Sequence, residues 1–329
     1  MIPCNETPFE AELFRSSLDA QRSLAVAVVK ATVAFDESGR LWLDPAPIPV
    51  IRAPKSIHGF ELETDGTLAK PAVDILAIGN ARPLARASTR EMLVGFTVGD
   101  LHARLAVFGD RHWHKATFGW RASDALPFES MPVSWTRAFG GVSRKQGMPA
   151  LHPENPKGKG YVADPRELVE GHPLPNIEDA SQMIRSPADQ PPPLAFEPLT
   201  STSPIRVQHS HARAREGSLI SPAFFNVAHP RWQIPALAGG EVVRLFGWHP
   251  HAVAPFVLPS VGLVADVRIE DRDYQYPFRL DGLCMFPNEN RFTLTWRCVF
   301  SYAFVRRARR VVRIARSEMF GRDREVSHV

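Results

Sequence analysis

The sequence predicts an α+β fold that is mainly β, with antiparallel sheets, a long Pro/Gly-rich insertion and a C-terminal amphipathic helix. Three observations support this. The chain has 30 prolines in 329 residues, well above the usual share of about 5%, and proline disfavours helix interiors. Val-rich or alternating runs separated by turn residues lie before Phe108 and after Gly240. Near the end of the chain, between residues 305 and 319, apolar residues instead recur three and four positions apart, which is the spacing of a helix.

The first expected hairpin joins residues 24–35 to residues 41–43 through a Gly-containing turn. Asp74 is a single polar position in an apolar run, which indicates a core-facing strand. A second hairpin turns at Gly99-Asp100. The remaining expected strands lie at 72–79, 91–98, 102–108, 241–248, 256–258, 263–269, 276–283 and 292–302.

The stretch 109–203 is predicted to be a long ordered insertion across this sheet system. Prolines recur through its second half without periodicity. Large apolar residues punctuate 151–178, so this part is expected to be packed. Residues 179–203 contain few large apolar side chains and are expected to be looser.

The end of the chain is predicted to be helical. One narrow apolar stripe is formed by Val305, Ala308, Val312, Ala315 and Met319, with arginines around it. We therefore divide the chain into a single β-rich domain, 1–304, and an Arg-rich helical tail, 305–329. The tail could pack on its own domain, on a partner protein or on an anionic surface. Nucleic acid is not expected as a partner, because the arginine-rich stretch 305–319 lacks aromatic residues for stacking.

Composition narrows the class of protein further. The formal net charge of +4 is mild, and the C-terminal arginines account for it, so the body is no uniformly basic nucleic-acid binder. Three cysteines without metal-ligand spacing fit a reducing compartment. The first residues resemble no signal peptide, and no apolar run approaches the length of about 18 residues that a membrane span needs. A cytoplasmic location is expected.

Several short motifs carry a family resemblance that covers about residues 24–302. In chain order they are Gly109-Asp110-Arg111 with Trp113, Met131-Pro132 with Trp135, Arg137 to Gly141, Asn155-Pro156 with Gly158 and Gly160, Leu174 to Glu178, Phe224-Phe225-Asn226, Gly239-Gly240-Glu241, Leu258-Pro259 and Thr295-Trp296-Arg297. The chain resembles a bacterial domain-of-unknown-function family encoded beside type VI secretion genes. It departs from that family at 205–221, which is short and basic here.

This resemblance implies an accessory adaptor or chaperone rather than an enzyme. Its partners would be a secreted effector and the VgrG or PAAR spike proteins, with no small-molecule substrate and no cofactor. The candidate partner-binding residues are Trp135, Arg137, Phe139, Asn155, Arg309 and Arg313. Arg137 has two interpretations: a clamp for an anion or a partner carboxylate, or a buried arginine stacked on an aromatic ring and bonded to loop carbonyls. We favour the second.

Histidines provide the alternative from another class, a metal-dependent enzyme. Six of the twelve form His-x-His pairs, and on a strand such a pair shares one face and could chelate a metal. Asp110 or Glu241 could complete a site. The pairs are His112/His114, His209/His211 and His249/His251. A binder of anionic polymers that uses the Arg-rich tail is the third hypothesis.

Other reactive motifs are weak. Residues 157–160 (Lys-Gly-Lys-Gly) lack the first glycine and the Ser/Thr of a phosphate-binding loop, so a turn is the preferred interpretation. No Gly-x-Ser-x-Gly is present. Glu270, Asp271 and Asp273 are expected at a solvated hairpin tip rather than as an acid/base pair.

Overall fold

Two long strands, β3 (Ser23–Phe35) and β25 (Arg291–Ser301), form the centre of the computed structural model and pair antiparallel along eleven positions, from Arg291 opposite Ala34 to Ser301 opposite Leu24. The model describes residues 4–17, 23–57, 60–212, 221–269, 272–301 and 310–317. Along β25 the side chains alternate, so Phe292, Leu294 and Trp296 face one side of the sheet while Thr293, Thr295 and Arg297 face the other. This alternation agrees with the sequence prediction.

The largest sheet has the order β19-β7-β24-β25-β3-β2, with β4 added to the end of β3. All its pairs are antiparallel except β7 with β24. Its other strands are β2 (Glu10–Ser17), β4 (Leu41–Leu43), β7 (Val73–Ala77), β19 (Gln233–Ile234) and β24 (Arg279–Phe286). The predicted first hairpin, β3 with β4, is confirmed.

A second sheet, in the order β18-β10-β9-β20-β21, is antiparallel throughout. Its strands are β9 (Glu91–Val98), β10 (Leu101–Phe108), β18 (Ile177–Asp179), β20 (Val242–Phe246) and β21 (Phe256–Val257). The main hydrophobic core joins its Phe96 and Leu105 to Val33, Leu294 and Phe292 of the largest sheet. The predicted hairpin of β9 and β10 is also confirmed.

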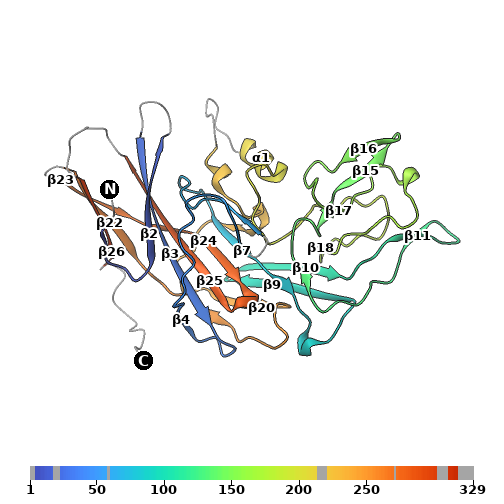
Figure 1. Cartoon of the computed structure of the whole chain (residues 1–329), viewed down its shortest axis with the longest axis horizontal. Helices are drawn as coiled ribbons and strands as arrows, with labels where there is room; N and C mark the ends of the chain where they lie inside the picture. Colours follow the sequence, from blue (N-terminus) through green and yellow to red (C-terminus); the bar gives the residue numbers. More distant parts are fainter. Residues whose placement is uncertain are drawn as a thin grey trace.

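A third sheet has the order β1-β26-β22-β23 and packs against the beginning of β3 and the end of β25 (Figure 1). Its strands are β1 (Cys4–Asn5), β22 (Leu263–Ile269), β23 (Arg272–Pro277) and β26 (Arg310–Arg316). Ala265 and Val312 pack here against Ala27 and Phe300. Together the three sheets confirm a mainly β chain with antiparallel sheets.

The predicted C-terminal helix is wrong over the part that the structure describes. Residues Arg310–Arg316 form strand β26, in which Val312 and Ile314 are buried while Val311 and Arg313 are exposed. The strand pairs with β22, Arg313 lying opposite Asp266, and with β1. Long-range pairing has therefore overridden the helical spacing. Residues 302–309 and 318–329 lie outside the described ranges.

The loop region, residues 109–203, occupies the right-hand side of Figure 1. It contains short strands and one 3-10 turn, Pro165–Glu167, and its strand β18 joins the second sheet. The strands are β11 (Trp113–Lys115), β12 (Trp120–Ala122), β13 (Met131–Pro132), β14 (Phe139–Gly140), β15 (Val142–Lys145), β16 (Met148–Leu151) and β17 (Lys159–Gly160). Leu194 and Phe196 are buried in the main core, so the looseness predicted for 179–203 is wrong there.

The remaining elements are short. Helix α1 (Pro204–His211) begins with a proline at its first turn, where the missing N–H costs nothing. The small strands are β5 (Lys55–Ile57) paired with β6 (Phe60–Leu62), and β8 (Asn80–Ala81) paired with β13. Further 3-10 turns lie at Leu84–Arg86, Pro222–Phe225, Pro230–Trp232 and Pro287–Glu289.

Candidate functional site

The two motifs that distinguish the sequence meet inside the loop region. Strands β14 and β17 pair in parallel, Phe139 lying opposite Lys159 and Gly140 opposite Gly160. The buried Asn155 side chain donates through Nδ2 to the main-chain oxygens of Trp135 (2.9 Å) and Phe139 (3.0 Å). One amide thus satisfies two carbonyls of a segment twenty residues earlier, and it fixes the shape of the turn.

The glycine pair permits this close packing. Gly141 has φ +92°, and a Cβ there would lie 2.4 Å from the main-chain oxygen of Gly158. Gly140, at φ +140°, would carry a Cβ 2.2 Å from the oxygen of Asn155. Both the backbone angle and the contact require glycine. Residues 157–160 accordingly serve as a turn against the glycine pair.

Trp135, Phe139 and Asn155 are buried, with exposed fractions of 8%, 3% and 5%. The Trp135 indole donates to the Glu197 main-chain oxygen (3.1 Å) and packs against Ala195 and Leu199. In this conformation the three side chains support the loop region from inside. A direct contact between them and a partner would need the loops to move, and their role in partner binding stays a prediction.

Arg137 is half-exposed and belongs to a polar network at the end of β10. Its Nη1 donates to Asn176 Oδ1 (3.2 Å) and lies 3.7 Å from Asp110 Oδ1. Asp110 Oδ1 accepts from Lys159 Nζ (2.7 Å) and from Asn176 Nδ2 (3.0 Å). The Lys159 hydrogen bond is the main reason that the pKa of Asp110 lies below its usual range. The favoured interpretation of Arg137 as buried and stacked is therefore wrong.

Exposed apolar side chains are concentrated on the outside of the loop region. Among the described residues, large hydrophobic side chains are exposed at fourteen positions, and seven of these lie between 109 and 203. Val142 and Leu151 are cross-strand neighbours on the β15–β16 hairpin, exposed by 57% and 61%, and Met148 near its turn is exposed by 68%. Val142 and Leu151 thus place apolar surface in solvent on one face of this hairpin, and contiguous exposed apolar surface is typical of binding sites.

Hydrogen bonds connect this hairpin to the neighbouring loops. Gln146 N and Gly147 N donate to the Glu167 carboxylate, the second at 3.1 Å. Lys115 N of β11 donates to Glu170 Oε2 (2.8 Å). Val169, between the two glutamates, is exposed by 61%, and Phe118 in the β11–β12 turn by 89%. We call the five side chains the outer rim: Phe118, Val142, Met148, Leu151 and Val169.

The histidine pairs do not converge. His112 and His114 lie on or beside β11 with ring centroids 6.5 Å apart. His209 and His211 lie on helix α1 rather than on a strand, so they do not share the face that the prediction assumed. Among the residues described, three or more His, Cys, Asp or Glu side chains are nowhere grouped as metal ligands.

The third pair, His249 and His251, has ring centroids 5.4 Å apart. His249 Nε2 lies 2.6 Å from the Pro287 oxygen and 2.9 Å from Asn290 Oδ1. His251 Nε2 lies 3.4 Å from Glu37 Oε1. Asp110 and Glu241 do not join any pair, since Asp110 bonds Lys159 and Asn176 and Glu241 accepts from Ala238 N (2.9 Å).

Two half-buried titratable groups beside Trp135 have strongly shifted pKa values, and no sequence pattern indicated them. Burial raises the pKa of Glu197 to about 7. Burial, with a smaller contribution from Arg231, lowers the pKa of His229 to about 4. The His229 ring centroid lies 6.1 Å from that of Trp135. Both groups favour their neutral forms, which is consistent with a packed junction between the loop region and the sheets.

A small charged chamber lies between the largest sheet and residues 44–70, with a volume of about 80 Å³. A water molecule occupies about 30 Å³ in the liquid, so it has room for only a few. Its cations already have partners: Lys30 with Asp65, Lys70 with Asp74 (2.8 Å) and Arg297 with Asp281. Asp74 also accepts from Asn226 Nδ2 (2.9 Å), which accounts for a polar residue in that core strand.

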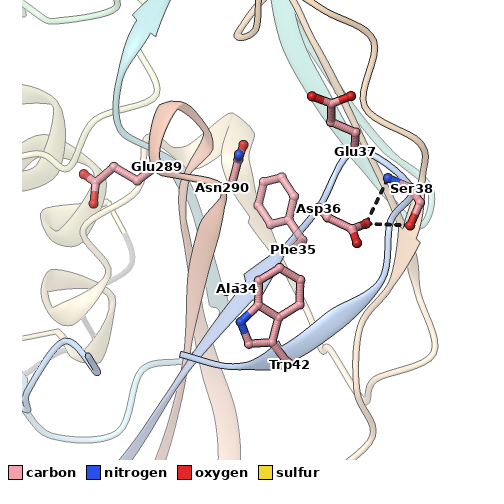
Figure 2. Close-up of a pocket in the computed structure, with 8 residues that line it drawn as sticks. All are labelled: Ala34, Phe35, Asp36, Glu37, Ser38, Trp42, Glu289 and Asn290. Atoms are coloured by element: carbon pink, nitrogen blue, oxygen red, sulfur yellow. Dashed lines mark hydrogen bonds between the residues drawn. The ribbon is translucent and has the colours of Figure 1, made fainter. Parts of the chain in front are cut away.

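A larger recess, with a volume of about 590 Å³, opens at the tip of the β3–β4 hairpin (Figure 2). Asp36, Glu37 and Glu289 line it together with the half-exposed Trp42. The sequence prediction placed only a turn here. Trp42 lies three residues after the glycine of that turn, and its exposure depends on which side of β4 remains uncovered, which the local sequence does not specify.

Of the two tail arginines predicted to bind a partner, Arg309 and Arg313, the structure describes only Arg313. Arg313 on β26 donates to Glu6 through Nε (2.7 Å) and Nη2 (2.6 Å) and lies 3.6 Å from Asp266. It is half-exposed, but these carboxylates already bind it. Arg309 lies outside the described residues, as do Glu270 and Asp271 of the expected hairpin tip. Asp273, on β23, pairs with Arg268.

Comparison with known proteins gives one match. The family model described as "Uncharacterized protein conserved in bacteria (DUF2169)" matches residues 20–297, a range that includes β3, the first part of β25 and the whole loop region. Neither the curated proteins nor the solved structures contain a match. Among the residues described, no helix has the length and hydrophobicity of a membrane span.

Proposed function

This chain belongs to the DUF2169 family of uncharacterized bacterial proteins, and from this membership we propose that it is an adaptor that binds another protein and catalyses no reaction. Its cargo, in this proposal, is a type VI secretion effector linked to a PAAR or VgrG spike protein, held before secretion and helped onto the spike. The type VI assignment follows the family resemblance of the sequence motifs. The binding role has a structural argument of its own.

The outer rim is the observation that carries the binding role. Its five apolar side chains are exposed by 57% to 89%. Fully burying one large apolar side chain contributes roughly 1.5–3 kcal/mol, so covering several of them would stabilise a complex substantially. Phenylalanine and methionine are also enriched in the buried parts of protein interfaces.

The framework beneath the rim supports the same role. Asn155, the glycine pair and the Glu167 and Glu170 hydrogen bonds hold the rim-bearing loops in place. A surface that is already ordered loses less conformational entropy on binding than a flexible one. The described residues provide no observation in favour of a metal-dependent enzyme or an anionic-polymer binder.

The test is a double substitution, Phe118→Ser with Met148→Ser. We expect it to weaken binding of the effector or spike protein encoded beside this gene by at least about tenfold. Truncating one anchor side chain of an interface often costs more than about 1 kcal/mol of binding free energy. Binding is measured by calorimetry with purified proteins, and effector release is measured in a type VI-active strain that carries the variant.

Leu84→Ser is the matched control, because Leu84 is exposed by 66% and lies outside the rim. It should leave both measurements unchanged. Equal thermal stability of all three proteins would show that the fold is intact. If the double variant binds and supports release as well as the unmodified chain, the outer rim is not the binding surface.

A further inference from the structure

The recess at the β3–β4 hairpin is a second uncovered surface, distant from the outer rim along the long axis of the molecule (Figure 1). Figure 2 shows Trp42 below Phe35, with Asp36 and Glu37 on one side and Glu289 on the other. The recess is shallow and open to solvent, so a side chain of a partner can lie across it.

The charge of the recess is negative. Three of its lining residues are carboxylates, and no lysine or arginine lines it. Hydrogen bonds from Ser38 to Asp36 lower the pKa of that carboxyl and favour its charged form. Glu37 is exposed by 70%. Glu289 pairs with Arg291, which also lies 3.4 Å from Asp44, so this cation is shared between two carboxylates.

An aromatic wall completes the chemistry. Trp42 is exposed by 44% and lines the recess. Among side chains, tryptophan is the best partner for a cation placed over its face. Carboxylates together with an exposed indole favour an arginine or lysine side chain rather than an acidic or purely apolar one.

The backbone next to Trp42 is open to a further strand. Among the described residues, β4 pairs only with β3. Asp36 N donates to the Arg40 oxygen (3.2 Å) and Asp44 N to the Thr32 oxygen (3.0 Å). Bonded positions alternate in an antiparallel pair, so the N–H and C=O groups of Leu41 and Leu43 face away from β3. Such an edge can accept an extended peptide.

We propose that β4 and its recess bind an extended segment of a partner protein, with a basic side chain placed against Trp42 and among the three carboxylates. The segment adds as a strand along β4, and its arginine or lysine adds positive charge beside these carboxylates. This inference rests on the proposed function only in requiring that the chain has a protein partner. It does not use the outer rim.

The probe is a labelled, terminally blocked peptide with the repeat Gly-Val-Arg-Val-Arg-Val-Gly, titrated with the full chain and followed by fluorescence anisotropy. Two matched peptides replace both arginines by glutamate or by uncharged citrulline. We expect the arginine peptide to bind at least about tenfold more tightly than either, with an affinity that falls as salt rises. Equal binding of the three peptides, or none up to millimolar concentration, overturns the proposal.

Variants of the protein locate the site. We expect the affinity for the arginine peptide to fall by at least about tenfold in Trp42→Ala. We expect the same loss in the double variant Glu37→Gln with Glu289→Gln. Tyr274→Ala, an exposed aromatic on the edge strand β23, and Glu129→Gln, an exposed carboxylate elsewhere, are the controls. Binding that survives Trp42→Ala would overturn the proposal. The double variant Phe118→Ser with Met148→Ser should bind this peptide as well as the unmodified chain does. The proposal for the outer rim and the proposal for the recess can therefore be refuted separately.

Discussion

The Asn155 side chain donates a hydrogen bond of 2.9 Å to the main-chain oxygen of Trp135, so it joins two motifs that lie twenty residues apart in the sequence. The same amide also bonds the Phe139 oxygen. Asn155→Ala leaves both buried acceptors without a donor, and we expect it to lower the free energy of unfolding by about 1–3 kcal/mol. Chemical denaturation measures this loss, and Lys157→Ala on the exposed side of the same turn should cause almost none.

Gly141→Ala should destabilise the protein more than Gly147→Ala. Both glycines have positive φ, +92° and +74°, so the conformational cost of alanine, about 1–2 kcal/mol, is shared. Only at Gly141 would the new Cβ meet a main-chain oxygen, at 2.4 Å, whereas nothing lies within 4 Å at Gly147. Melting temperatures of the two variants measure the difference. Equal melting temperatures would mean that the Gly141–Gly158 contact is not tight in solution.

The buried pair of Arg297 and Asp281 gives a third prediction. Both side chains are exposed by only 2%, so Arg297→Met leaves a buried carboxylate without its cation and should cost about 3–5 kcal/mol. Adding Asp281→Leu removes that charge and should restore part of the loss. Urea unfolding of the two single variants and the double variant measures the coupling. Additive losses would show that the two groups do not interact.

The raised pKa of Glu197 predicts a stability that depends on pH. Its folded pKa of about 7 exceeds the ordinary value of 4.5, so the unfolded state loses its proton first as pH rises. The contribution of this group is therefore fully present below pH 4.5 and is lost as pH rises through 7. Glu197→Gln cannot ionise, and above pH 7 it should be more stable than the unmodified chain by up to about 3 kcal/mol.

Unfolding free energies of both proteins from pH 4.5 to 8 test this. The two curves should meet near the acidic end and separate as pH rises. His229 changes the stability with pH in the opposite direction, because its folded pKa of about 4 lies below the ordinary value of 6.5. Its contribution is present above pH 6.5 and is lost as pH falls towards 4. A constant difference between the curves would mean that Glu197 ionises normally in the folded protein.

Local sequence predicted much of the sheet structure. The hairpins of β3 with β4 and of β9 with β10 combine apolar runs with a Gly-containing turn, so neighbouring residues specify them. The C-terminal strand β26 was mistaken for a helix because Val312 and Ala315 fit a helical stripe as well as Val312 and Ile314 fit a strand. The choice depends on β22, more than forty residues away, whose register no local pattern contains.

The candidate surfaces could be predicted only in part. The motifs around Trp135 and Asn155 were recognised, but the burial of these side chains was not predicted, since a large aromatic side chain serves equally well in a core and in an interface. The outer rim and the recess consist of ordinary apolar and acidic residues. They become distinctive only when the fold leaves them uncovered, which is a property of the assembled sheets and loops.

The central pairing of β3 with β25 joins residues 23–35 to residues 291–301, so a long intervening stretch of chain is synthesised between the two partners. While the intervening residues emerge, Val29 and Val33 have no β25 opposite them and remain open to premature contacts. This sheet can therefore close only after β25 has been made, and such long-range pairing is expected to fold slowly.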